Sequence, residues 1–324
     1  MKLLISAWML LLVLPVQAQR VDVYSYLRTD LSQPVAEVSA QIQEMASSAG
    51  LEVQASLEAG VPDGCSFAAE VLVLHDPDYA ASLMAMNPRT GAFATTDRIL
   101  VFEDERGTHV SMVDPVAVVR TVMLDLPSAT ELARTHRSRV EAALAALPGD
   151  PASKGYGPSR DRGLIGKTMG VMAGGPFDEK VQEHGRVNRT RAEVATALQS
   201  ALTGTGTWQL SAKYRLDYPN QGITVLGVTG ASMEARSFEI VKEGSDGDRG
   251  SLQCPGTAHA AAYPIELVIR EDGDEVAIEF IDAMYRMKMF FEDAGKWAFM
   301  KNMGMPGSIA DDLKDALSRA GAGS

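Results

Sequence analysis

The chain has 324 residues, 46% of them hydrophobic, and a formal net charge of −12. This length suits two domains of ordinary size, and the hydrophobic fraction argues against a disordered chain. The negative charge, without any run of Lys or Arg, disfavours nucleic acids and anionic membrane surfaces as partners, because both are bound through positive charge.

Residues 1–18 have the pattern of a secretory signal peptide. A lysine precedes an apolar stretch at residues 3–14, and Val16-Gln17-Ala18 resembles a small-residue cleavage site. The apolar stretch is too short to span a bilayer comfortably. We therefore expect a periplasmic or secreted protein whose mature chain has no integral membrane segment.

Residues 19–148 are expected to form one domain with the order strand, helix, four strands, helix. Alternating apolar residues indicate the strands, and apolar residues three or four positions apart indicate the helices. The predicted segments are strands at 21–28, 51–57 and 67–77, helices at 32–48 and 78–86, a hairpin at 98–114, and helices at 115–123 and 128–147.

Residues 149–165 are rich in Pro, Gly, Ser and charged residues, a composition typical of a linker. A second domain is expected at 166–324. Its predicted segments are a first strand at 164–174, a helix at 189–202, strands at 208–216 and 222–230, an irregular exposed insertion at 231–261, a hairpin at 265–282, and a helical tail to about residue 320.

The two predicted hairpins have similar sequences. RILVFEDERGTHVSMVD (98–114) and IELVIREDGDEVAIEFID (265–282) each contain an apolar strand, an acidic turn with one Gly, and an alternating strand that ends in Asp. Such a recurrence indicates duplication of one small α+β unit. The alignment matches residues 100–102 to 267–269, Gly107 to Gly273 and Val110 to Val276.

Residues 71–115 (VLVLHDPDYAASLMAMNPRTGAFATTDRILVFEDERGTHVSMVDP) resemble the core of the domain of unknown function 302 family. The shared pattern is an apolar strand ending at a Pro turn, a short helix, and an acidic hairpin ending in Asp-Pro. The resemblance covers about residues 22–148, whereas residues 166–320 match mainly through their hairpin, with Ala283 at the position of Pro115. It implies an α+β fold of two tandem β-α-β4-α units resembling the TATA-binding-protein-like fold class, the second one divergent. It implies no activity.

The chain contains two cysteines, Cys65 and Cys254. In an oxidising compartment they are candidates for one disulfide, which would join the two units. Alternatively, each is an independent small buried hydrophobic residue. The sequence leaves both interpretations open.

The sequence contains no recognisable catalytic set. None of the five histidines has a second His or Cys at metal-ligand spacing, and His75, beside Asp76, is the best candidate among them. Its alternative interpretation is a half-exposed turn residue. No serine-nucleophile motif is present, and the Gly-Lys-Thr at 166–168 lacks the rest of a phosphate-binding loop. We therefore favour a protein that is not an enzyme.

Methionines are concentrated near the end of the chain, where the pattern M-x-x-M-x-M occurs twice within residues 284–305. Three interpretations are open: the apolar face of a core helix, an adaptable ligand or partner surface, and a Cu(I) site, since thioethers are soft ligands. The candidate surface comprises Met284, Met287, Met289, Met300, Met303, Met305, Phe290 and Trp297. The candidate copper ligands are Met284, Met287, Met300 and Met303.

The sequence thus predicts an exported binding module without a cofactor. Its partner would be an unidentified small molecule or protein, and not a nucleic acid. The alternative prediction is a soft-metal protein that binds Cu(I) through the Met-rich segment 284–305.

Overall fold

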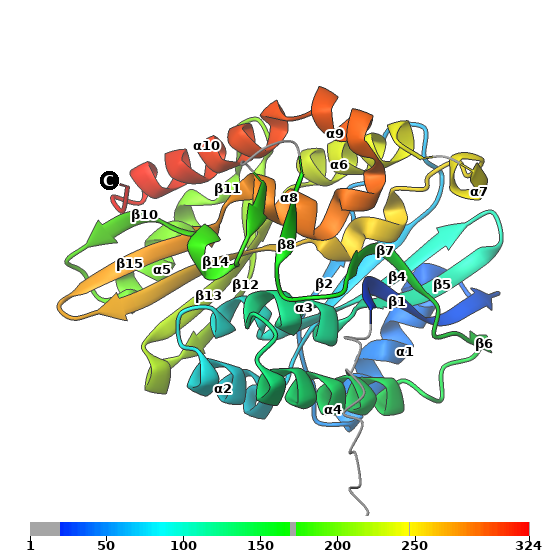
Figure 1. The fold of residues 1–324 in the computed structure, drawn as a ribbon, viewed down its shortest axis with the longest axis horizontal. Helices are drawn as coiled ribbons and strands as arrows, with labels where there is room; N and C mark the ends of the chain where they lie inside the picture. Colours follow the sequence, from blue (N-terminus) through cyan, green and yellow to red (C-terminus); the bar gives the residue numbers. More distant parts are fainter. Residues whose placement is uncertain (1–19, 169–172, 246, 324) are drawn as a thin grey trace, which may run out of the picture.

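The computed structural model describes residues 20–168, 173–245 and 247–323. The predicted signal peptide at 1–18 lies outside these residues. The chain forms two halves, each built from an antiparallel sheet and helices (Figure 1). The predicted α+β class is confirmed.

The first half contains the predicted strand, helix, four-strand and helix order. Its elements are β1 (Val21–Leu31), α1 (Val35–Ser48), β2 (Glu52–Glu58), β3 (Ala69–His75), α2 (Pro77–Met86), η1 (Gly91–Ala94), β4 (Thr96–Asp104), β5 (Gly107–Val113), α3 (Pro115–Val122), α4 (Pro127–Ala143), β6 (Asp150–Pro151) and β7 (Gly155–Arg160). The sheet order is β2-β3-β4-β5-β1-β6, with β7 also paired to β1.

The second half contains a similar order of elements with several short additions. They are β8 (Ile165–Thr168), β9 (Ala173–Gly175), η2 (Asp178–Lys180), β10 (Val181–Val187), α5 (Arg191–Ala201), β11 (Thr203–Thr205), β12 (Leu210–Tyr218), η3 (Pro219–Gln221), β13 (Ile223–Thr229), α6 (Ala231–Glu243), α7 (Gly247–Gly250), η4 (Thr257–Ala262), β14 (Ile265–Asp272), β15 (Glu275–Ile281), α8 (Ala283–Phe291), η5 (Glu292–Ala294), α9 (Lys296–Lys301) and α10 (Gly304–Arg319). The sheet order is β10-β15-β14-β13-β12-β11. Read from the other edge, β12-β13-β14-β15-β10 has the connectivity of β2-β3-β4-β5-β1.

Three segments differ from the sequence-based expectation. Residues 149–165 are not a free linker, because β7 pairs with β1 at the sheet edge, where Pro and Gly are tolerated. The strand predicted at 164–174 is instead two short antiparallel strands, β8 and β9, and its residues 169–172 lie outside the described residues. The strand that pairs with β15 is β10. The expected insertion at 231–261 contains α6, whose buried face includes Glu234 and Ser237. These polar residues obscured its helical periodicity.

The hairpin alignment also requires a correction. The pair that closes each turn is Asp104–Gly107 in the first hairpin and Asp272–Glu275 in the second. Counted from the turns, residues 267–269 correspond to 99–101 and not to 100–102. Matching Gly107 to Gly273 gave the wrong alignment, because Gly107 follows its turn whereas Gly273 lies within its turn. A one-residue shift matters because it moves every side chain to the opposite face of the sheet.

Aspartates begin the corresponding helices after both hairpins. Asp114 accepts a hydrogen bond from the backbone N–H of Val116 at 2.8 Å, and Asp282 accepts one from Tyr285 at 2.8 Å. Each carboxylate thereby satisfies a backbone donor that the first helical turn leaves free. Although Ala283 replaces Pro115 in α8, the N-terminal cap is retained.

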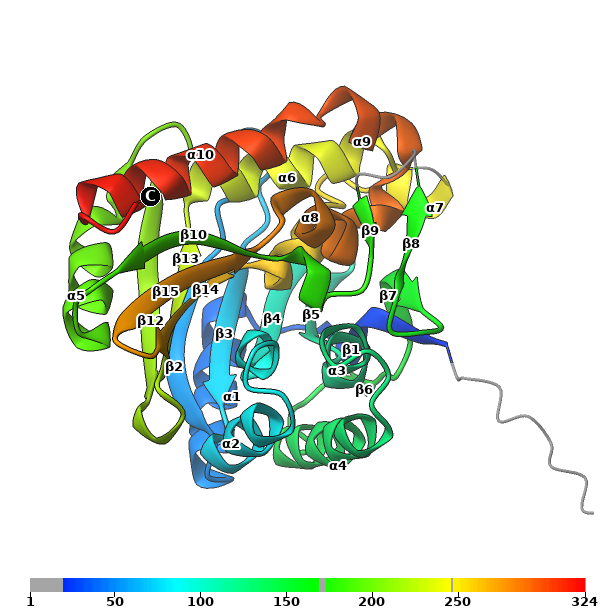
Figure 2. The same cartoon turned by 60° about the vertical axis from the view of Figure 1, so that its left-hand side comes forward.

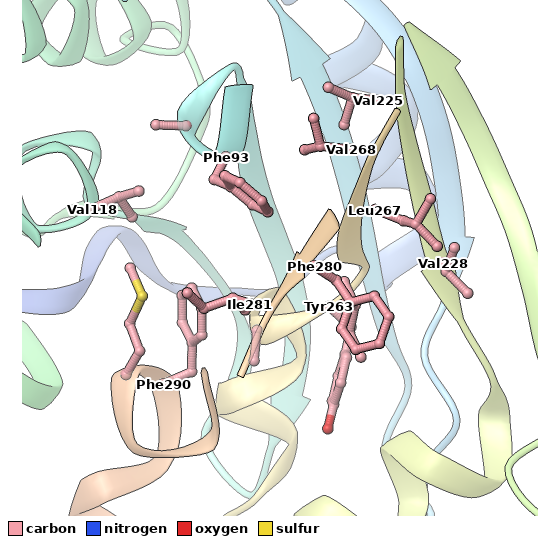
Figure 3. Packing of buried hydrophobic residues seen from close by; sticks show 14 of the residues in the cluster. Phe93, Val118, Val225, Val228, Tyr263, Leu267, Val268, Phe280, Ile281 and Phe290 are labelled. Atoms are coloured by element: carbon pink, nitrogen blue, oxygen red, sulfur yellow. The ribbon is translucent and has the colours of Figure 1, made fainter. Parts of the chain in front are cut away.

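Helices cover the outer faces of the two sheets, and the inner faces meet. Val38 and Ile42 of α1 pack with Val140 of α4 in a separate cluster on the first sheet. Helices α5 and α10 cover the second sheet (Figure 2). One continuous core then joins the halves, and Figure 3 shows Phe93 and Val118 of the first half around the same core as Phe290 of the second.

Candidate functional site

Two arginines and one glutamate are buried where the inner faces of the sheets meet. Arg98 comes from β4, Glu266 from β14 and Arg286 from α8, and their exposed fractions are 4%, 7% and 5%. The Glu266 carboxylate lies 3.3 Å from Nη1 of Arg98 and 3.6 Å from Nη2 of Arg286. The cluster therefore contains two cations and one anion.

Both guanidinium groups use the same protein partners. Arg98 donates to the carbonyl oxygens of Ala262 and Pro264 at 3.0 and 3.2 Å, and Arg286 donates to the same two oxygens. The two guanidinium carbons lie 4.8 and 4.9 Å from the ring centroid of Phe290. These cation–π contacts provide favourable electrostatics in a region from which water is excluded.

The hydrogen bonding of the arginines is nevertheless incomplete. Within the part of the chain that the structure describes, Nε of Arg98 and Nε of Arg286 are buried without a hydrogen-bond partner. Buried polar groups are normally paired with protein, water or an ion. Burial lowers the pKa of Arg286, Glu266 opposes this effect, and Arg98 adds to it.

A small cavity lies beside Arg286, between α8, α10 and the second sheet. Its volume is about 30 Å³, and apart from Arg286 and the hydroxyl-bearing Tyr263 its lining is apolar. Burial raises the pKa of Tyr263 to about 12, so this hydroxyl stays neutral at ordinary pH. The apolar lining includes Ile265, Phe280, Met287, Ile309 and Leu313. Arg286 is thus the one charged group in the lining.

The Met-rich segment divides between core and surface. Met289, Phe290 and Met305 are buried, while Met284 and Met287 are half-buried. Trp297 is 73% exposed, and Met300 and Met303 are also exposed. The eight residues of the candidate surface therefore do not lie on one face, because α8 packs into the core and α9 projects from it.

Four of the five histidines contact carboxylates. His75 is buried, unlike the half-exposed turn residue considered from the sequence, and contacts Glu52 at 2.9 Å and Tyr218 of the second half at 3.0 Å. His136 lies between Asp97 at 2.7 Å and Asp76 at 3.5 Å. The further pairs are His109 with Asp104 and His259 with Asp293, both at 2.9 Å. These contacts hold elements together.

The cysteines form a disulfide in the structure. Cys65 lies in the β2–β3 loop and Cys254 precedes η4, with a Cα–Cα distance of 5.8 Å and 189 residues between them in the sequence. The bond therefore joins the two halves. A pocket of about 210 Å³ lies beside it, lined from both halves by residues that include Asp63, Glu239 and Lys242.

Neither a metal cluster nor a membrane span is found in residues 20–168, 173–245 and 247–323. Over these ranges no group of three or more His, Cys, Asp or Glu side chains is placed to hold a metal ion. No helix there has the length and apolar character needed to cross a bilayer.

The first half carries a recognisable family pattern. Residues 27–147 match the model of DUF302, a domain of unknown function. The resemblance expected for the first half is thus confirmed, and the matched residues end before β6. The DUF302 region contributes Arg98 to the buried cluster, whereas Glu266 and Arg286 lie outside it.

Among solved structures, that of a DUF302 protein is similar to part of the chain. It is the crystal structure of an uncharacterized conserved DUF302 protein from Bacillus stearothermophilus, with 21% sequence identity and a TM-score of 0.31. The similarity covers 40% of this chain and 97% of that one. No curated protein matches the sequence.

The sequence prediction missed Arg98, Glu266 and Arg286. A signal for two of them was present, since Arg98 lies six residues before Asp104 and Glu266 lies six residues before Asp272. Opposite charges at the same distance from the two hairpin turns indicate that the two residues can pair. The correct turn alignment was needed to see it.

Proposed function

We propose that this protein is an exported, non-enzymatic binding module that holds a small monocarboxylate with a short apolar chain. The binding site is the cavity between α8, α10 and the second sheet. The observation that carries the proposal is the buried Arg286, whose Nε has no hydrogen-bond partner among the described residues and which lines an otherwise apolar cavity.

The charge balance supports an anionic ligand. A guanidinium stays protonated in proteins, so Arg98 and Arg286 bring two positive charges against the single negative charge of Glu266. An uncompensated buried charge costs several kcal/mol. A carboxylate beside Arg286 would balance the charge and accept from the free N–H.

The size and lining of the cavity support a short ligand. A cavity needs roughly 10–15 Å³ to hold one water molecule, so about 30 Å³ admits a group of only a few atoms. Apolar side chains from Ile309 and Leu313 of α10 would contact the methyl group of the ligand. A multiply charged ligand would find no second cation in this lining.

The proposal is tested by titrating the mature protein with acetate, and with ethylammonium as the matched cation, using calorimetry. Acetate should bind and ethylammonium should not. Arg286→Gln should abolish binding, and Ala283→Leu should weaken it by filling the cavity from the start of α8. Circular dichroism of each variant checks the fold. Absence of acetate binding to the unmodified protein would refute the proposal.

Export from the cytoplasm belongs to the same proposal. It is supported by the signal-peptide pattern at residues 1–18. Mass spectrometry of the protein isolated from its own cells should find a mature chain beginning at Gln19. A full-length chain retained in the cytoplasm would contradict it.

We further propose that residues 166–324 are a divergent copy of the DUF302 unit. The support is the equivalent connectivity of β12-β13-β14-β15-β10 and β2-β3-β4-β5-β1. A sequence profile built from relatives of residues 166–324 should then match the DUF302 model. A well-populated profile that fails to match would contradict common descent.

Cu(I) binding is the second candidate function. The observation in its favour is that Met300 and Met303 are both exposed and lie three residues apart. Replacing Met284, Met287, Met300 and Met303 with Leu nearly conserves volume, so it should abolish Cu(I) binding without unfolding the protein. Unchanged Cu(I) affinity in this variant would eliminate the methionine site.

A further inference from the structure

The disulfide between the halves is placed where a reactant can reach it. Cys65 and Cys254 are both partly exposed, and both line the pocket of about 210 Å³. This volume is many times the roughly 10–15 Å³ that a cavity needs to hold one water molecule. A small thiol reagent therefore fits beside the Cys65–Cys254 disulfide.

The surrounding contacts show what would hold the halves together without the disulfide. Gln253 donates to the carbonyl oxygen of Gly64 at 2.8 Å, and its own backbone N–H donates to Glu105 of the first half. Farther inside, Arg98 pairs with Glu266 within the continuous core. Breaking the bond therefore leaves a large interface in place.

We propose that the pocket at Cys65–Cys254 is a thiol–disulfide exchange site for a dithiol. The attacking thiolate forms a bond to one cysteine sulfur, the Cys65–Cys254 bond breaks, and the other cysteine leaves as a thiolate. The second thiol of the reagent then displaces the remaining cysteine from the mixed disulfide. The dithiol is oxidised to a disulfide, and its two protons and two electrons convert the protein disulfide to two thiols.

The charged residues that line the pocket should change the rate of thiol–disulfide exchange. The attacking group is an anion, so the exposed Lys242 should favour its approach, whereas Glu239 should oppose it. Neither residue contacts the buried arginine cluster. Substitutions at these two positions therefore change the electrostatics of the pocket without disturbing the core.

The experiment reduces the folded mature protein with dithiothreitol, without denaturant, and counts alkylated cysteines by mass spectrometry over time. Direct attack predicts a rate that rises in proportion to the dithiothreitol concentration, with the circular dichroism spectrum retained. If the rate instead levels off with concentration, reduction requires prior unfolding and the proposal is overturned. Reduction that occurs only in denaturant would overturn it as well.

Two matched variants test the pocket itself. Lys242→Glu should slow reduction by roughly twofold to tenfold at low salt, and Glu239→Gln should accelerate it. Both effects should shrink in high salt, because the charges are close to water. Equal rates for the unmodified protein and both variants at low salt would show that the thiol does not enter through this pocket.

Discussion

Nη1 of Arg98 and Oε1 of Glu266 lie 3.3 Å apart, in a pair that links equivalent strands of the two sheets. Each residue stands six positions before the Asp that closes its hairpin turn. The same strand position thus carries a cation in one half and an anion in the other. This difference in charge between the two strands is part of what joins the halves.

Glu266→Gln should destabilise the protein strongly. The substitution keeps the shape of the side chain but leaves Arg98 and Arg286 buried without their shared carboxylate. Removing one partner of a buried ion pair costs about 3–5 kcal/mol. Urea unfolding measures this change. The control is Glu131→Gln in an exposed pair with Arg134, where we expect at most about 1 kcal/mol.

Two histidines should make the free energy of unfolding depend on pH, His136 as the pH rises above about 6.5 and His184 as it falls below that value. Burial alone would lower the pKa of His136, but Asp97 and Asp76 outweigh it and raise the pKa. A raised folded-state pKa gives stability that is complete below the unfolded value of about 6.5 and is lost as pH rises through the folded-state value. Burial lowers the pKa of His184 to about 4, so stability from this residue is lost as pH falls from about 6.5 to about 4.

The measurement is the free energy of unfolding as a function of pH. His136→Gln should flatten the decline above pH 6.5, and His184→Gln should flatten the decline below it. Each variant is the control for the other. Identical pH profiles for both variants and the unmodified protein would contradict the assigned directions.

Asp293 should contribute a separate loss of stability in acid. Burial alone would raise its pKa, but His259 and Arg249 lower it from 3.8 to about 2. The lowered value gives stability that is present above the unfolded pKa and is lost as pH falls from 3.8 towards 2, by about 2 kcal/mol. Acid unfolding followed by circular dichroism should show this loss. Asp293→Asn, measured as the control, should remove the corresponding slope.

The Cys65→Ser/Cys254→Ser variant should remain folded but lose stability. Closing a loop of 189 residues restricts the unfolded chain, which corresponds to roughly 5 kcal/mol in the chain-entropy model. Native-state strain reduces such values, so we expect a loss of about 2–5 kcal/mol in urea unfolding. A loss below about 1 kcal/mol would show that the core alone fixes the halves.

Phe290→Ala and Trp297→Ala should separate the two parts of the Met-rich segment. Phe290 is 3% exposed and lies against both guanidinium groups, so its removal should cost about 3–5 kcal/mol. Trp297 is 73% exposed, and its removal should change stability by about 0.5 kcal/mol or less. Thermal unfolding compares them directly. Similar losses for both would mean that α9 packs more tightly than the structure indicates.

Local patterns predicted most elements because local interactions suffice to form them. The alternating residues of β1 and the apolar run of β3 lie where periodicity placed them. The helix predicted at 115–123 begins at Pro115, where Asp114 accepts a backbone N–H group. The helix predicted at 78–86 begins one residue earlier, at Pro77, and Asp76 accepts backbone N–H groups there.

The segments that local patterns missed depend on partners far away in the chain. Strand β7 follows from pairing with β1, because its own composition resembles a turn. Helix α6 can bury polar residues because they find hydrogen-bond partners in the other half. For example, the backbone N–H of Gly60 donates to the carboxylate of Glu234 at 2.6 Å. Neither partner can be identified from the periodicity of the segment itself.

The amino-acid sequence by itself determined the α+β class, the two similar hairpins and the family resemblance of the first half. Each depends on the spacing of apolar, turn and charged residues within a short segment. Only the tertiary structure brought Arg98, Glu266 and Arg286 together, buried His75 against Tyr218 and placed Cys65 beside Cys254. The physical reason is burial between two packed sheets. In the sequence, a charged residue in a strand looks the same whether it is exposed or buried. It needs a partner of opposite charge only when a second sheet excludes water from it.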